Sequence, residues 1–547
     1  MTYRILLQSF ATLTLSVSLT IILIFYPGLK AEATFPGKPV AHGNPSDSDE
    51  YHDPEFSKVH EFVKQGKTDK ALDILEIKIK NKLTRPTALI LKSLILNDQN
   101  RPLAALTGVM KAVNLQMRHP SLQFALCQIH RNMGQKELAT RACIIAVQQH
   151  PNAPEVHYER AQTLMAVGNM NEANKELKQA SKLDPNNPLY PYERGLIFTY
   201  LNDPDRAQQA FEKALVADAN HLDSAYQLAY IQAVSNRVDK AKELISHILR
   251  SDQRHPKQRS ARVLSDYIEK KSLDKLPQKI EPAEYHKSRS KAFYKSGKFG
   301  LSLLEIQTAS KIKPDDLKIQ EILIGLSGLL LRINIEEPAV KKFIEMTREN
   351  ETSQARGYQK LGDIMVLKGD LDKAGVYYEK AIELGDPKYL AKTSLDELPI
   401  KKKIGVIPLK PTELFDNPTD ALNRTGEVFA HYTMYKSALG MYSLALQMNP
   451  QHRMTMLNIG AAHYKMKKYN RAITVLEKTL ATYPNHPDIE GHRLLLARSY
   501  VKKGDWQGGV KNLRALIQLN PRYKEIVKTD PIFSPLHDKD YYNKLME

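Results

Sequence analysis

The sequence lacks the short motifs that most enzyme families carry. It has no glycine-rich phosphate loop after a strand pattern, no His-Glu-x-x-His and no Gly-x-Ser-x-Gly. Its 17 histidines are scattered, and the pairs His452/His463 and His486/His492 do not have the i, i+4 spacing that places two metal ligands on one helix face. The sequence therefore predicts a non-catalytic protein with neither a metal nor a cofactor.

Cysteine, tryptophan and long apolar runs are also scarce. Cys127 and Cys143 are the only cysteines, so no cysteine near the N-terminus could be lipid-modified, and Trp506 is the only tryptophan. One apolar run near the N-terminus is long enough to span a membrane, and no second one follows. The chain is 42% apolar and 26% charged, as ordinary folded proteins are. With 547 residues the chain is too long to fold around one compact core, so we expect several domains or a repeat array.

The N-terminal residues have the character of a targeting segment. Residues 5–26 carry no charge, and small residues ending at Ala33 have the spacing that a signal peptidase recognises. The uncharged run is longer than most cleaved signals and could cross a hydrocarbon core of about 30 Å. Residues 1–33 are therefore either a cleaved signal peptide or a membrane anchor. Both alternatives predict that the rest is extracytoplasmic, in the periplasm or cell envelope, with residues 34–54 as a flexible tether.

The chain is strongly basic, with a formal net charge of +18. In a cytoplasmic protein this charge would favour nucleic acid as the partner. In an exported protein the expected counterparts are anionic lipid head groups, acidic glycans or acidic proteins, and a solvated surface without a partner is the alternative. We therefore expect no nucleic-acid partner.

A repeat of 34 residues organises the first half of the chain. Small residues stand twelve positions before a ladder of alanines, and mostly larger apolar residues stand four positions after it. Two antiparallel helices approach closely only where both carry small side chains, and the larger residue fills the gap toward the next pair. Prolines at the boundaries are expected to end each second helix. The alanines are Ala71, Ala105, Ala139, Ala173, Ala207 and Ala241; the small residues are Val59, Ser93, Cys127, Ala161, Gly195 and Ala229; the larger residues are Leu75, Val109, Cys143, Leu177, Phe211 and Ile245; the prolines are Pro86, Pro120, Pro154, Pro188 and Pro256.

This pattern resembles the tetratricopeptide repeat (TPR) family. The best copy, PEVHYERAQTLMAVGNMNEANKELKQASKLDPNN at 154–187, matches the family's small–small–large–small pattern and its closing proline, Pro185, with His157 in place of its tryptophan. The resemblance implies an all-α fold, a right-handed solenoid of about ten to twelve helix–turn–helix repeats in three blocks. The likeness recurs at 295–314, 360–387, 424–450, 458–484 and 497–521.

Breaks in the register divide the repeat array into blocks. We expect a block of six repeats, a basic connector, a middle block, a linker rich in Pro and Lys, a C-terminal block and a polar cap. A helical but off-register stretch lies within the middle block, at 317–350. In order, the segments are 55–256, 257–282, 283–387, 388–418, 419–521 and 522–547.

The two cysteines fall within one repeat, one on each helix. Cys127 and Cys143 are about equally far from the expected turn near Gln135, so antiparallel pairing would bring them to the same height. In an oxidising compartment they could form a disulfide, which would contribute about 2–4 kcal/mol. The alternative is that both are compact apolar core residues.

A row of tyrosines is the strongest candidate for a binding site. Tyr158, Tyr192 and Tyr226 are spaced by 34 residues, one turn before the small residue of each first helix. First helices line the concave surface in the TPR family, so the resemblance implies that this row faces a groove. Tyrosines there could anchor an extended peptide or a sugar face, and packing between adjacent first helices is the alternative. The groove candidates are Tyr158, Gln162, Tyr192, Tyr200, Tyr226 and Tyr230.

The family's Lys/Asn/Arg clamp for a C-terminal carboxylate is not apparent, because the corresponding positions carry Tyr, Glu, Leu and Gln. Arg160 and Arg194 recur in Tyr-Glu-Arg runs and are expected to brace adjacent helices or to pair with Glu159 and Glu193.

The repeats and the export segment together predict a scaffold that binds other proteins in a secretion, pilus or envelope-biogenesis complex. The alternative is an adaptor for an exported polysaccharide.

Overall fold

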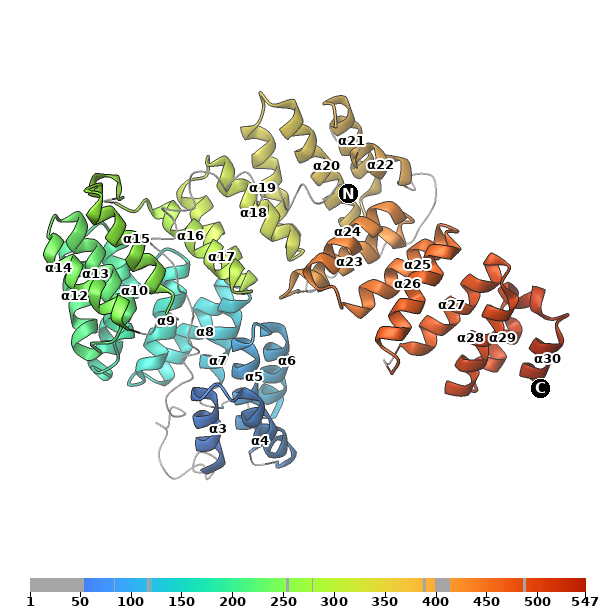
Figure 1. The fold of residues 1–547 in the computed structure, drawn as a ribbon, viewed down its shortest axis with the longest axis horizontal. Helices are drawn as coiled ribbons and strands as arrows, with labels where there is room; N and C mark the ends of the chain where they lie inside the picture. The colour runs from blue at the N-terminus through green and yellow to red at the C-terminus, as the bar shows by residue number, and fades with distance from the viewer. Residues whose placement is uncertain are drawn as a thin grey trace. The chain divides into compact units, whose positions relative to one another are not determined.

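The computed structural model describes residues 54–547 except for 83, 116–118, 120, 252–254, 278, 387–389, 399–413 and 486–487. In this part of the chain all regular structure is helical, and the helices pair in sequence as a TPR solenoid, which confirms the predicted fold class (Figure 1). The predicted signal peptide or anchor, residues 1–33, and the tether up to residue 53 lie outside the described residues. None of the described helices has the length and apolar character that a membrane span requires.

The described residues divide into two compact units, and the chain passes from one to the other between Leu326 and Ser327, within a helix. The N-terminal unit begins with six helix pairs, each a first helix and a second helix joined by a tight turn. The first helices are α3 (Pro54–Lys64), α5 (Arg85–Asp98), α7 (Leu122–Asn132), α9 (Pro154–Ala166), α11 (Leu189–Tyr200) and α13 (Leu222–Val234). The second helices are α4 (Thr68–Lys80), α6 (Pro102–Leu115), α8 (Lys136–Gln149), α10 (Met170–Leu183), α12 (Pro204–Ala217) and α14 (Val238–Arg250).

The residue ladders of the sequence form the core of these pairs. Ala161 and Ala173 are fully buried, one on each helix of a pair. The larger residue packs against the first helix of its own repeat: a Cβ added to Gly195 would lie 2.6 Å from Cδ1 of Phe211. The glycine is therefore required there by the neighbouring ring, because close-packed interiors have no room for an added methyl group.

The boundary prolines begin helices rather than end them. Pro86 and Pro154 lie in the first turn of α5 and α9, and Pro188 and Pro256 are the N-cap residues of the helices that follow them. The first turn of a helix has no intrahelical acceptor for its N–H groups, so a residue without an N–H fits there. The expectation that these prolines end the second helices is wrong in this respect.

The N-terminal unit continues beyond its six pairs. The segment 257–282, expected as a basic connector, contains the helix α15 (Lys257–Glu269), which packs against α13 and α14 and buries Ala261 and Leu264. A short 3-10 turn, η2 (Leu273–Lys275), then leads to a helical hairpin. The two helices of this hairpin are α16 (Pro282–Lys295) and α17 (Phe299–Ile312).

The C-terminal unit starts within α18 (Leu317–Leu329) and ends in a cap. The cap buries Val527, Phe533 and Leu536 against Ala497 and Val501 of the last first helix, so its underside is apolar. The remaining helices of the unit are α19 (Ile333–Met346), α20 (Glu351–Lys368), α21 (Leu371–Glu383), α22 (Leu390–Glu397), α23 (Pro418–His431), α24 (Tyr435–Met448), α25 (Arg453–Lys465), α26 (Tyr469–Thr482), α27 (Ile489–Lys503) and α28 (Trp506–Leu519), and the cap consists of α29 (Tyr523–Thr529), η3 (Pro531–Leu536) and α30 (Asp540–Met546).

Candidate functional site

The first helices of the N-terminal unit do not face open solvent along their whole length. The hairpin α16–α17 packs onto them, with α17 in contact with both α7 and α9, as Figure 1 shows. More than a hundred residues of chain separate α17 from these two helices. We call the surface that the hairpin covers the first-helix groove, formed by α5, α7, α9 and α11 and the turns that follow them.

Four consecutive turns of the groove contact the hairpin segment. The turn residues have a positive φ, recur every 34 residues and are Asn100, Gly134, Gly168 and Asn202. The Asn100 side chain donates to the carbonyl of Ser296 at 2.9 Å, and the amide of Ile280 donates to the Asn202 side chain at 3.3 Å. Between them, a Cβ on Gly134 would lie 2.6 Å from the carbonyl oxygen of Gly300, and one on Gly168 would lie 3.1 Å from Cγ2 of Thr308.

Acidic side chains on the groove meet basic side chains of the hairpin. Burial raises the pKa of Glu159 and of Glu193, and each carboxyl is partly compensated by a cation, Arg131 beside Glu159 and Arg289 beside Glu193. Burial also raises the pKa of Asp98 to about 6, against the opposing effect of Lys298 from the hairpin. The groove wall is therefore acidic, and the hairpin supplies the balancing charge.

A second charge cluster holds the two helices of the hairpin together. Glu305 of α17 accepts from His286 Nδ1 at 2.6 Å and from Arg289 Nε at 2.8 Å, and all three side chains are buried. The Arg289 guanidinium also lies over the rings of Tyr285 and Phe293. Both carboxylate oxygens thus have a donor, as a buried carboxylate requires.

Two of the candidate tyrosines contact the hairpin or its approach. Tyr200 packs edge-to-face on Tyr285, with ring centroids 5.0 Å apart, and also on His286. The Tyr230 hydroxyl donates to the carbonyl of Pro277 at 2.8 Å. Gln162 is buried beside Glu193, which places it in the charged wall of the groove.

The tyrosines of the predicted row contact their own repeat array. Tyr158 packs on Tyr190 of the next first helix, and Tyr192 packs between Phe211 and His221. Tyr226 is fully buried beneath Lys257, whose ammonium lies 5.0 Å from the ring centroid. These contacts are those of the packing alternative, and the structure does not gather the six candidates into one exposed surface.

In the Tyr-Glu-Arg runs, the glutamate and the arginine bind different partners. Arg160 pairs with Glu176 at 2.9 Å, and Arg194 donates to Asn174 at 2.9 Å, so both arginines brace adjacent helices. Neither makes the alternative pair with Glu159 or Glu193, because those glutamates turn to the groove instead. Glu159 pairs with Arg131 of α7 at 2.8 Å.

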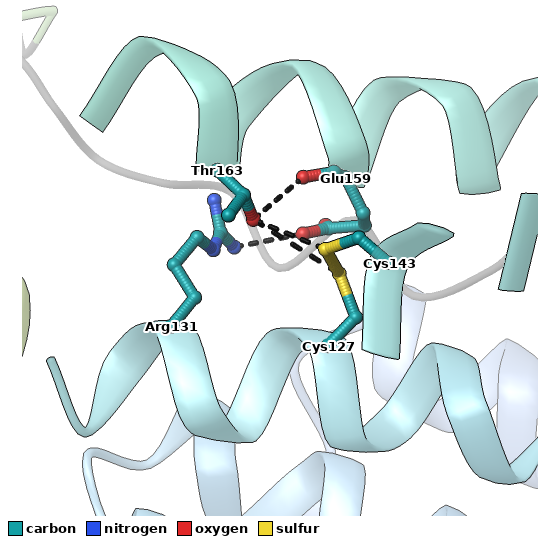
Figure 2. The surroundings of a disulfide bond; sticks show 5 residues. All are labelled: Cys127, Arg131, Cys143, Glu159 and Thr163. Atoms are coloured by element: carbon teal, nitrogen blue, oxygen red, sulfur yellow. Dashed lines mark hydrogen bonds and ion pairs between the residues drawn. A yellow bond between two sulfur atoms is a disulfide. The ribbon is translucent and has the colours of Figure 1, made fainter. Parts of the chain in front are cut away.

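Cys127 and Cys143 form a disulfide that links α7 to α8 within one repeat (Figure 2). Both residues are buried, and the Thr163 hydroxyl lies 3.3 Å from the sulfur of Cys143. The same hydroxyl donates to the carbonyl of Glu159, whose side chain reaches Arg131. The disulfide thus lies directly behind the charged wall of the groove.

The C-terminal unit has a polar cluster on its first helices. Asn423 donates to Glu427 at 2.8 Å within α23, and Asn458 of α25 donates to Asn423 at 3.0 Å and to Glu427 at 3.1 Å. The Glu427 side chain remains 34% exposed. Both amides donate to Oε1 of Glu427, and Arg424 pairs with Oε2 at 3.3 Å, so the cluster holds one partly exposed carboxylate in a fixed orientation.

The hairpin residues Arg289, Lys298 and Glu305 were missed in the sequence analysis. A lysine-rich stretch and a fair repeat match give no indication that the segment packs back onto earlier repeats. The signal that could have been used is the pair Glu159 and Glu193, two buried acids at the same repeat position. Elsewhere in the described chain, no group of three or more His, Cys, Asp or Glu side chains is placed to hold a metal ion.

Family models match separate parts of the chain. Models described as tetratricopeptide repeat match residues 154–187, 200–263 and 355–384. A model described as anaphase-promoting complex, cyclosome, subunit 3 matches residues 431–516. A search of curated protein sequences finds no match.

Solved structures with similar helical arrangements include several TPR proteins. TTC0263 from Thermus thermophilus is 19% identical, with 33% of this chain and 99% of that one covered and a TM-score of 0.29. A TPR protein from Parabacteroides merdae is 17% identical, with 57% and 97% covered and a TM-score of 0.27. MamA from Desulfovibrio magneticus is 18% identical, with 37% and 96% covered and a TM-score of 0.18. None is similar enough overall to indicate a shared function.

Proposed function

Because the described residues form a tetratricopeptide-repeat solenoid, we propose that the chain is a non-catalytic scaffold for protein–protein interactions. Solenoids of this kind present long surfaces built from successive first helices, which suit extended or helical partners. The observation that carries the proposal is the cluster of Asn423, Glu427 and Asn458. It holds a partly exposed carboxylate, oriented by two amides and by the ion pair with Arg424, on the first-helix face of the C-terminal unit.

We further propose that the scaffold works outside the cytoplasm, in a secretion, pilus or envelope-biogenesis complex. The buried disulfide between Cys127 and Cys143 supports an oxidising compartment, where such bonds persist. The uncharged residues 5–26 support export. The match of residues 431–516 to a subunit family of a large assembly is in keeping with a role in complex formation.

The alternative of a polysaccharide adaptor is less well supported. It depended on a tyrosine row as a platform for sugar rings, but Tyr226 and Tyr230 are buried within the chain and Tyr192 packs between two aromatic neighbours. A protein partner needs only a surface of mixed polarity, which both units provide.

Crosslinking in intact cells, followed by mass spectrometry of the captured proteins, tests the scaffold. We expect defined proteins to be captured by the wild type, and fewer by Glu427→Lys, which reverses the charge of the cluster's carboxylate and breaks its ion pair with Arg424. Glu379→Lys, an exposed glutamate on α21, is the matched control and should capture the same proteins as the wild type. The absence of any captured protein would refute the proposal.

A further inference from the structure

The hairpin α16–α17 occupies the first-helix groove in the way that a bound ligand would. The hairpin meets three successive turns of the repeat array, and Ile280, just before it, meets a fourth. Thr308 donates to the carbonyl of Ala166, the last residue of α9, and Asn100 in turn donates to Ser296, just after α16. Helix ends carry unpaired backbone groups, so each partner completes the other.

The contact between hairpin and groove includes buried polar groups. Tyr285 packs with Ala161 and Ile197, and beside this apolar part lie the buried charges of Glu193 and Arg289 and the hydrogen bonds at helix ends. The buried atoms Glu193 Oε2 and His286 Nε2 have no hydrogen-bond partner among the described residues. Interfaces that form and separate are more polar than permanent ones, and unpaired buried atoms weaken a contact.

We propose that α16–α17 is a displaceable plug, and that the first-helix groove is a binding site for a basic helical segment of a partner protein. In the free chain, its own hairpin fills this site. The proposal rests on the proposed scaffold function and assigns it a second site. A partner would gain access only when the hairpin leaves, so the groove would be closed until the partner competes for it.

The chemistry of the partner follows from what the hairpin supplies. With the hairpin displaced, the wall would present the acids Asp98, Glu159 and Glu193, with the cation Arg131 beside Glu159. The hairpin meets these acids with Arg289 on α16 and with Lys298, the N-cap residue of α17. A helix or helical hairpin with lysine or arginine on one face has the charge to replace it.

One substitution releases the hairpin without changing the groove. A Cβ on Gly300 would overlap the carbonyl oxygen of Asn132 and lie 2.6 Å from the carbonyl carbon of Met133. Alanine is a better helix former than glycine, so Gly300→Ala favours α17 itself and acts only on its docking. Gly491→Ala is the matched control, because a Cβ at this helical glycine meets no atom within 4 Å.

Hydrogen exchange on the full chain measures the release. We expect Gly300→Ala to raise exchange in α16 and α17 at least tenfold, with α8 and α10 unchanged and with Gly491→Ala equal to the wild type. Lys298→Glu, which places a like charge before Asp98 and Glu159, should have the same effect through charge alone. Wild-type exchange of the hairpin in both release variants would mean that it is a permanent part of the core, and would overturn the proposal.

The probe for the open groove is a labelled peptide of residues 280–313, which is the native hairpin itself. We expect it to bind Gly300→Ala at least tenfold more tightly than the wild type, and the peptide carrying Arg289→Glu and Lys298→Glu not to bind. Binding of the native peptide to neither released variant would overturn the proposal. The assay uses purified components, so it stands apart from the search for a cellular partner.

Crosslinking in cells then separates this proposal from the proposed function. Stronger capture of a protein by Gly300→Ala than by the wild type would support both. Equal capture by the two chains would keep the scaffold and overturn the plug. If neither chain captured a protein while the peptide bound the released groove, the scaffold function would fail and the groove would stand as a site for the chain's own hairpin alone, which would overturn the assignment of a partner.

Discussion

Thr308 of α17 donates a hydrogen bond of 2.8 Å to the carbonyl oxygen of Ala166, 142 residues earlier in the chain. The acceptor is the last residue of α9, where a helix has carbonyl groups without an intrahelical donor. The bond therefore joins two parts of the N-terminal unit that neighbouring-repeat contacts alone would not bring together. It is also one of the few hairpin contacts that a single side chain controls.

Thr308→Val tests this bond. Valine keeps the branched shape but leaves the Ala166 carbonyl without its donor, so we expect the free energy of unfolding of the N-terminal unit to fall by about 1–2 kcal/mol. Chemical denaturation followed by circular dichroism measures the change. Thr474→Val is the control, because that hydroxyl donates only to Asn470 of its own helix and is exposed; a loss of the same size there would contradict the assignment.

The disulfide gives a second prediction. Replacing Cys127 and Cys143 together with alanine should lower the free energy of unfolding of the N-terminal unit by about 2–4 kcal/mol, because the unfolded chain loses a closed loop. The measurement is denaturation with and without a reductant. The wild type should approach the double variant in the reductant, and a wild type that is insensitive to reductant would mean that the bond does not contribute.

How much of this could be predicted depends on the range of the interaction. The 34-residue ladders are set by contacts within a pair and between neighbouring pairs, so residues such as Ala161, Ala173 and Phe211 identify the core from the sequence alone. The pairing of Cys127 with Cys143 was left open beside a packing alternative, because the same two positions also suit compact apolar residues. Local periodicity is enough for this level of structure.

The docking of the hairpin could not be predicted in the same way. Arg289, Lys298 and Thr308 meet groove residues that lie several repeats earlier in the chain, and no periodic pattern links them. A single sequence also does not distinguish a buried glutamate such as Glu159 from a solvated one at an equivalent position. The sequence therefore places the tyrosine row and the nearby candidate Tyr200 in an open groove, although Tyr226 is covered by Lys257 and Tyr200 by Tyr285.

Because Asp98 is buried, we predict an unusual pH dependence for the stability of the N-terminal unit. Burial raises its pKa from 3.8 to about 6, so the folded state binds the proton more tightly than the unfolded chain does. Ionised Asp98 therefore destabilises the N-terminal unit above pH 6, and this penalty is relieved as the pH falls from 6 toward 4. Between pH 7 and pH 5 the gain should be about 1 kcal/mol. The raised pKa values of Glu159 and Glu193 act in the same direction.

Asp98→Asn should remove this contribution, so that the variant is more stable than the wild type at pH 7 and the difference shrinks at pH 5. Denaturation at the two pH values checks it. Asp203 provides the opposite case: its pKa is lowered by hydrogen bonds from Arg206, so its contribution is present at pH 7 and is lost only as the pH falls below about 4. Asp203→Asn should therefore be destabilised at both pH values.

The side chain of Glu397 holds α22, the helix after α21, in place in the C-terminal unit. Its carboxylate accepts from the backbone amides of Lys436 at 2.9 Å and Ser437 at 3.1 Å, in the first turn of α24. The first turn has amides without intrahelical acceptors and a partial positive charge, so a carboxylate from α22 both caps α24 and fixes α22 against it.

Glu397→Ala should therefore cost about 1–2 kcal/mol in the C-terminal unit and raise hydrogen exchange in α22 and in the first turn of α24. Glu397→Gln keeps one acceptor oxygen without the charge, so it should lie between the wild type and the alanine variant. Glu379 is exposed, so Glu379→Ala should change neither the free energy of unfolding nor the hydrogen exchange. If the alanine variant raised exchange in α22 but not at the start of α24, the carboxylate would serve only the packing of α22, and the role as a cap would be wrong.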